Sequence, residues 1–131
     1  NTRFQLYTVP GQVYYNATRK LVLQGADGII FVADSQEGKL EENKESMKNL
    51  IDNLKEYNVN IEEVPLIMQY NKRDLAKQGI PLLSLETIEK DLNSRLKAPS
   101  FGASALKGTN VVPTLKKIIV MTMASIQKEL K

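Results

Sequence analysis

The sequence contains no histidine and no cysteine. Without them the chain cannot form a disulfide or a zinc site built on Cys or His ligands. It also cannot build a Ser-His-Asp triad, a Cys-His pair or a histidine general base. Any metal must therefore be held by carboxylate, hydroxyl, water or ligand phosphate oxygens, which favours magnesium.

A strong excess of one charge is also lacking, since 18 Lys and Arg residues face 15 Asp and Glu residues, for a net charge of +3. The basic residues are scattered and not interleaved with aromatic residues, so the pattern does not favour nucleic acid as a partner. The longest uncharged stretch near the C-terminus, residues 118–127, is ten residues long, about half a membrane span. We expect no stable membrane anchor, and the absence of cysteine fits a cytoplasmic protein.

What is present is enough for one hydrophobic core, since 42% of the 131 residues are hydrophobic. Alternating or continuous apolar runs predict strands at 4–9, 28–34, 64–70 and 100–104. Apolar residues at helical spacing predict helices at 13–24, 40–57, 84–98 and 110–130. In the last helix we expect the inward positions to be Val112, Leu115, Ile119, Met123, Ile126 and Leu130.

This alternation of strands and helices predicts an α/β fold, with a parallel sheet and helices on both faces. In such folds ligands bind at the carboxyl ends of the strands. The residues that directly follow each predicted strand are therefore the candidate functional residues.

The strongest of these segments is Asn71-Lys72-Arg73-Asp74. A carboxylate here can accept two parallel hydrogen bonds from adjacent ring N–H and amino donors, and guanine offers that pair whereas adenine does not. We therefore expect Asp74 to select guanine, Lys72 to lay its aliphatic stem on the base, and Asn71 to join neighbouring loops. The alternative interpretation is an ordinary polar turn, since Asn and Asp both favour turns.

Two further strand ends carry suitable residues. Ser104 and Ala105 are small, which lets backbone N–H groups approach a base carbonyl closely. After the first strand, Gly11 permits a backbone N–H to meet a phosphate, and Gln12 can orient a water for attack on a γ-phosphate. The alternative at this place is a simple Pro-Gly turn.

Taken together, these three sites resemble those of Ras-like small GTPases. More narrowly, the chain looks like the bacterial gliding-motility group of that family, the MglA-like proteins. The segments that carry the likeness are 8–12, 19–21, 27–28, 32–36 and 69–74. The resemblance implies a three-layer P-loop NTPase fold of the Ras-like type with a mostly parallel sheet, here missing its first strands and first helix.

The resemblance also implies roles for single residues. Gly11 would contact the γ-phosphate and Gln12 would position the attacking water. Thr8 stands where most small GTPases have an Asp that reaches magnesium through water, so its link to the metal is weaker. The implied ligands are GTP or GDP and Mg²⁺. The residues that match the guanine-specificity motif and the second guanine loop are Asn71, Lys72, Asp74, Ser104 and Ala105.

No phosphate-binding loop of the form G-x-x-x-x-G-K-[ST] occurs in the chain. We therefore expect residues 1–131 to be the C-terminal portion of a single small-GTPase domain, a portion that is inactive alone. The implied function is a switch that hydrolyses GTP to GDP and controls cell polarity and gliding motility. The implied partners are a roadblock-type GTPase-activating protein and polarity or motility effectors, with recruitment to the cell poles.

Two alternatives stay open at this stage. The first is an interaction module of the same fold that no longer binds nucleotide, which the missing phosphate loop supports. The second is a phospho-acceptor signalling domain of flavodoxin-like fold, with Asp34 as the acceptor and with Ser104 and Lys107 nearby. That domain would also need a pair of acidic residues at the end of an earlier strand, and the chain does not show one.

Overall fold

The computed structural model describes Leu23 and residues 26–129. The strand expected at 4–9, and the helix expected at 13–24 apart from Leu23, lie outside the described residues. The same is true of Leu130 at the end of the last predicted helix.

The described part of the chain contains a parallel sheet of three strands in the order β1-β2-β3. The strands are β1 (Ile29–Asp34), β2 (Leu66–Asn71) and β3 (Ser100–Gly102). Each falls within or close to a predicted range, so the predicted parallel α/β architecture is confirmed for these residues.

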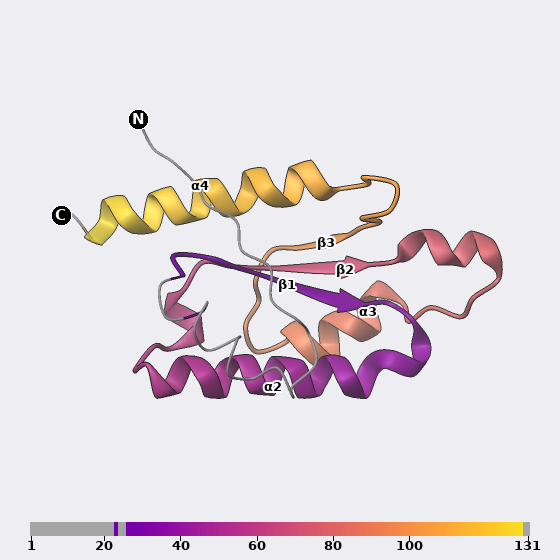
Figure 1. Ribbon diagram of the computed structural model, residues 1–131, viewed down its shortest axis with the longest axis horizontal. Helices are drawn as coiled ribbons and strands as arrows, with labels where there is room; N and C mark the ends of the chain where they lie inside the picture. The colour runs from indigo at the N-terminus through magenta and orange to yellow at the C-terminus, as the bar shows by residue number, and fades with distance from the viewer. Residues whose placement is uncertain (1–22, 24–25, 130–131) are drawn as a thin grey trace.

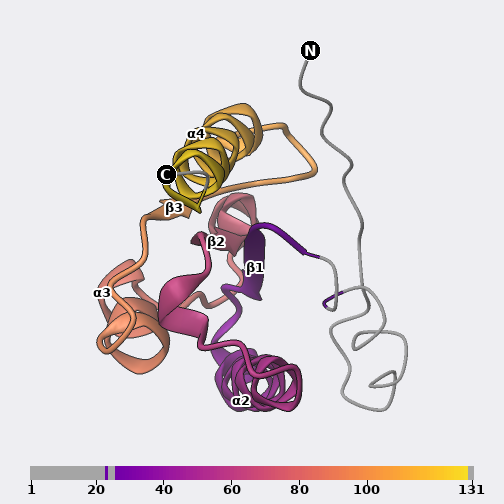
Figure 2. The ribbon, with the colours of Figure 1, turned by 90° about the vertical axis from the view of Figure 1, so that its left-hand side faces the viewer.

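Within the same residues, three α-helices cover the sheet: α2 (Leu40–Glu56), α3 (Leu85–Ile88) and α4 (Val111–Glu129). Figures 1 and 2 show α4 on one face of the sheet and α2 with α3 on the other, which makes three layers. Shorter helical segments are the 3-10 turns η2 (Glu37–Lys39), η3 (Ile61–Glu63) and η4 (Arg73–Gln78) and the π-helix η5 (Glu89–Asn93).

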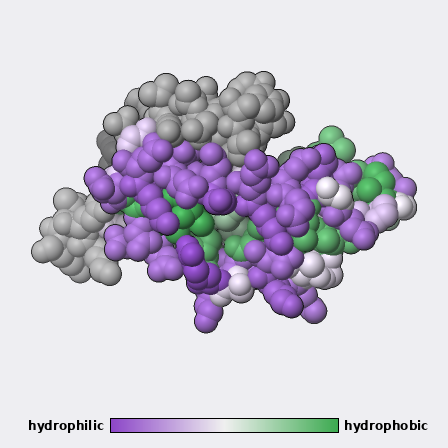
Figure 3. All heavy atoms as spheres, turned by 90° about the horizontal axis from the view of Figure 1, so that it is seen from below, coloured by the Kyte–Doolittle hydropathy of each residue, from purple (hydrophilic) through white to green (hydrophobic). Residues whose placement is uncertain are grey.

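The core lies between β2 and α2. The first five residues of β2 are buried, as expected for a central strand covered on both faces. Met47, Leu50 and Leu54 form the buried stripe of α2, as their spacing predicts. The outer face of this helix carries its charged residues, and Figure 3 shows that the molecule is mostly hydrophilic on this side.

The helix expected at 84–98 differs from the prediction. Ser84 does cap it, because its hydroxyl accepts a hydrogen bond from the Thr87 backbone N–H at 3.1 Å. The α-helical part, however, ends at Ile88 and continues as the π-helix η5. The apolar residues at helical spacing in this segment, which predict its inward face, are Leu85, Ile88, Leu92 and Leu96. Leu85 is instead 40% exposed, whereas Ile88 and Leu92 are buried.

Polar contacts account for the wider turn in η5. The Tyr70 hydroxyl, buried at the end of β2, donates a hydrogen bond to the Glu89 carboxylate. The Asn93 side chain bonds both to Glu89 and to the backbone of Ala98, the latter at 2.8 and 2.9 Å. Burial, followed by the hydrogen bond to Glu89, raises the pKa of Tyr70, so this hydroxyl stays a donor. These bonds hold η5 against β2 and replace the regular helix ladder.

The last helix agrees only in part with the expected inward face, on which Leu115 and Ile119 are half-buried. Val112, Met123 and Ile126 are 56%, 36% and 37% exposed, so their predicted inward orientation is wrong. Among the α4 residues whose side chains are described, the fully buried ones are Thr114 and Thr122.

Two contacts with the sheet layer set this rotation of α4. The Thr114 hydroxyl accepts a hydrogen bond from the buried Gln69 amide of β2 at 3.0 Å and donates to the Asn110 carbonyl at 2.6 Å. Gly28 lies so close to α4 that a Cβ there would be 2.5 Å from the Thr122 hydroxyl oxygen. A buried amide needs a partner, and Thr114 provides it on the face where apolar residues were expected.

We predict that Thr114→Val destabilises the protein by about 1–3 kcal/mol, because it leaves the buried Gln69 amide without its partner. The measurement is the free energy of unfolding in denaturant. Thr109→Val, at an exposed position, is the matched control and should change stability by less than about 0.5 kcal/mol. Equal losses in the two variants would contradict the role given to the Gln69–Thr114 bond.

Candidate functional site

The carboxyl ends of the three strands meet at one edge of the sheet. In the parallel register Asp34 pairs with Asn71, and Tyr70 pairs with Gly102. The segments 71–74 and 103–105 lie at the ends of β2 and β3, so the sheet brings these two of the predicted strand-end segments side by side.

Asn71 joins the loops on both sides of β2. Its side-chain oxygen accepts a hydrogen bond from the Ala105 backbone N–H at 2.8 Å. Its backbone carbonyl accepts one from the Ser35 N–H at 3.1 Å, on the side of β1. The Arg73 N–H adds a bond to the Ala103 carbonyl at 3.0 Å. The prediction that Asn71 ties neighbouring loops together is confirmed.

The loop after β3 is a tight, internally bonded turn. Ser104 is buried and exchanges two backbone hydrogen bonds with Thr109, at 2.9 and 3.2 Å. The Ser104 hydroxyl accepts a hydrogen bond from the Lys107 N–H at 3.2 Å, and Ala105 is exposed. The Ala105 N–H, which sequence reasoning directed at a base oxygen, donates to Asn71 in this structure.

Lys72 and Asp34 form an ion pair across the strand ends. The Lys72 ammonium lies 2.9 Å from the Asp34 carboxylate, and the two side chains are 48% and 22% exposed. The other contacts of that carboxylate come from Gln36, through its backbone N–H at 3.0 Å and its side-chain amide at 3.2 Å.

Asp74 lies in the first turn of η4 and is partly buried. Among the described residues, no hydrogen bond or ion pair engages its carboxylate. The neighbouring Arg73 has a structural role, because its guanidinium donates a hydrogen bond to the Leu83 carbonyl at 2.7 Å. The Asp74 carboxylate is therefore the group in this cluster that can accept a pair of hydrogen bonds from a ligand.

Sequence reasoning missed two residues that shape this edge. Asp34 was considered as a phospho-acceptor, not as the partner of Lys72. Asn43 of α2 was not considered, yet its amide bonds both the N–H and the carbonyl of Asp34, at 3.1 and 2.8 Å. One signal for Asn43 was available, because it lies four positions before Met47, on the buried face of the helix.

The residues expected around phosphate and metal lie outside the described residues, namely Thr8, Gly11 and Gln12. In the part of the chain that the structure describes, no group of three or more acidic residues is placed to hold a metal ion. The fit of a nucleotide can thus be judged only where its base would bind, at the bond between Asn71 and Ala105 and at Asp74 in the turn that follows β2. None of the described helices is long and apolar enough to cross a membrane.

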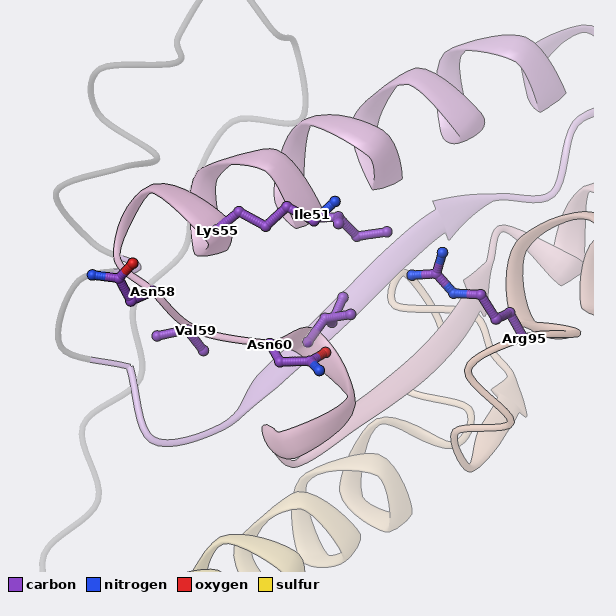
Figure 4. Close-up of a pocket in the computed structure, with 7 residues that line it drawn as sticks. Ile51, Lys55, Asn58, Val59, Asn60 and Arg95 are labelled. Carbon is purple, nitrogen blue, oxygen red and sulfur yellow. The ribbon is translucent and has the colours of Figure 1, made fainter.

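A groove of about 320 Å³ lies away from this edge of the sheet. Figure 4 shows it between the C-terminal turn of α2, the segment before β2 and the side chain of Arg95. Its lining combines apolar side chains with two asparagines and with the cationic Lys55 and Arg95. Arg95 lies 3.7 Å from Glu62, so part of that charge is already compensated. The groove contains none of the strand-end residues, and we therefore place the candidate site at the carboxyl edge.

We predict an acid-dependent loss of stability through Asp34. Burial alone would raise the pKa of this carboxyl, but the Gln36 N–H and Lys72 outweigh it and lower the pKa below its usual value. The ionised Asp34 carboxylate thus stabilises the folded state above about pH 4. This stabilisation is lost as the pH falls through the lowered pKa.

The measurement is the free energy of unfolding at pH 7 and pH 3 for the wild type and Asp34→Asn. The difference between the two proteins should shrink on acidification. Asp27→Asn, at the other end of β1, controls for the loss of a carboxylate elsewhere. A difference that stays constant with pH would show that the Asp34 charge contributes nothing.

Comparison with known proteins agrees with this geometry. Residues 1–122 match the ADP-ribosylation factor family. The chain is 45% identical over 127 residues to the mutual gliding-motility protein MglA of Myxococcus xanthus (strain DK1622), an alignment that covers 97% of the chain. The chain spans 63% of the length of that relative. The likeness to MglA, first suggested by the strand-end segments, is confirmed. The chain therefore belongs to the ADP-ribosylation factor family of Ras-like small GTPases.

Proposed function

We propose that the protein is a guanine-nucleotide-binding switch that hydrolyses GTP to GDP. The observation that carries this proposal is the joining of two loops at the carboxyl edge of the sheet. Asn71 bonds to Ala105, and the neighbouring Asp74 carboxylate has no partner among the described residues. Membership of a small-GTPase family supports the same conclusion.

The chemistry of this edge favours guanine over adenine. Guanine presents a ring N–H and an amino group side by side, and the ionised Asp74 carboxylate can accept both. The base carbonyl would share the Ala105 N–H with Asn71 or draw it away. Lys72 would cover one face of the base with its aliphatic stem, and the buried Ser104 would hold the second loop in place.

The remaining roles follow from the family and from residues beyond the described part. Gly11 would contact the γ-phosphate and Gln12 would position the attacking water. Mg²⁺ would neutralise phosphate charge when bound, with Thr8 near its water shell. The nucleotide-free interaction module and the phospho-acceptor domain receive no support from the family match, and we do not propose them further.

The name of the Myxococcus relative suggests the process that this switch serves. We propose a role in cell polarity or gliding motility, with polarity or motility effectors as partners. A GTPase-activating protein of the roadblock type would complete the cycle, and recruitment from the cytoplasm to the cell poles would localise it. Residues 1–131 would form the C-terminal portion of the GTPase domain.

The first test is stabilisation of the full-length protein by nucleotide. GDP with Mg²⁺ at a hundredfold excess over its Kd should add about 2.7 kcal/mol of stability, because it binds only the folded state. Thermal unfolding with and without ligand measures this, and ADP is the matched control. An equal response to ADP and GDP, or no response to either, would contradict the proposal.

The second test is the substitution Asp74→Asn. We predict that the affinity for GDP falls about 10- to 100-fold, because charge-assisted hydrogen bonds to the base are lost. Affinity for xanthosine diphosphate should rise, since the Asn amide can donate to the additional carbonyl of xanthine. Equilibrium binding of fluorescent nucleotides measures both. Asp91→Asn, at an exposed position in η5, should change neither affinity.

A further inference from the structure

We propose that Asp34 is a positioning residue for the guanine site and that it acts through Lys72. The inference deepens the proposed function and rests on it. Lys72 would serve as a cover for the base only if its side chain is held across the strand ends. The structure contains a chain of contacts that does this.

The first element of this chain is the backbone of Lys72. Its φ of 67° and ψ of 25° place it in the left-handed region, which residues with a side chain rarely adopt. Such a conformation persists only where the surroundings impose it, and it recurs at sites that clamp ligands. Here the residues before and after Lys72, Asn71 and Arg73, are both bonded to the loop after β3, which fixes the backbone of Lys72 between them.

The second element is the direction of the Lys72 side chain. Lys72 follows β2, but its ammonium lies 2.9 Å from Asp34, the last residue of the neighbouring strand β1. The aliphatic stem therefore runs from the end of β2 to the end of β1, along the carboxyl edge of the sheet. Without Asp34, that long stem would be free to rotate into solvent.

The third element is the anchoring of Asp34 itself. Asn43 of α2 holds the backbone N–H and carbonyl of Asp34, at 3.1 and 2.8 Å. Gln36 bonds to the carboxylate through its backbone N–H and its side-chain amide. Because Asp34 is fixed from both its backbone and its carboxylate, it can orient the more exposed Lys72, and not the reverse. Preorganisation of this kind reduces the entropy lost on binding.

The test is a double-mutant cycle on the release of a fluorescent GDP analogue from the full-length protein. We expect Asp34→Asn to speed release about fivefold in the wild-type background. Lys72→Met keeps the stem but removes the charge, and it should speed release by the same factor. Adding Asp34→Asn to Lys72→Met should then have no further effect. Asp27→Asn, at the far end of β1, is the matched control and should leave release unchanged.

A second measurement needs no nucleotide. Acetic anhydride labelling, followed by mass spectrometry, reports how accessible the Lys72 amine is in the nucleotide-free protein. Asp34→Asn should increase the labelling rate of Lys72 and leave that of Lys55 unchanged. This comparison detects loss of the ion pair directly. If Asp34→Asn does not fold, the exposed Lys72 still permits the test, because Lys72→Arg should restore the slow release that Lys72→Met loses.

The outcomes separate the two proposals. GDP binding by the wild type with unchanged release in Asp34→Asn would overturn this inference alone. An effect of Asp34→Asn that is equally large with and without Lys72→Met would also overturn it, because Asp34 would then act independently of Lys72. Absence of GDP binding by the wild type would overturn the proposed function and this inference together.

Discussion

The end of strand β2 is the constraint on which the rest of the described structure depends. β2 pairs with β1 on one side and β3 on the other, and helices cover both of its faces. Asn71 terminates it with bonds to Ser35 on one side and Ala105 on the other. Because both neighbouring loops are bonded to one residue, they are held at a fixed separation.

Polar side chains at buried positions fix how the layers sit on β2. Gln69 bonds to Thr114 of α4, and Tyr70 bonds to Glu89 of η5 on the other side. These two residues are neighbours in a strand, so their side chains point to opposite faces. A buried polar group without a partner is costly, which makes each bond specific to one arrangement of its helix. The same strand that ends in the candidate site thus orients the helices on both sides of the sheet.

Sequence patterns predicted the elements that depend on local periodicity. The continuous apolar runs of β1 and β2 and the stripe of Met47, Leu50 and Leu54 in α2 were located correctly for this reason. The face of α4 and the π-turn of η5 were not. Val112 and Met123 have apolar side chains at helical spacing, and periodicity cannot weigh them against a threonine with a buried hydrogen bond. Leu85 was misplaced similarly, because the contacts of Glu89 and Asn93 reshape the helix that follows it.

The amino-acid sequence by itself determined which kinds of residue stand at the strand ends, because strand limits are local and the residues after them can be read directly. It also excluded histidine and cysteine chemistry. Only the tertiary structure decided which of these residues meet. Lys72 and Asp34 are separated by 38 positions, and Asn71 and Ala105 by 34. Parallel pairing places their strands side by side, and no local pattern encodes the resulting distances. Short-range preference therefore predicted the site's components, while long-range packing assembled them.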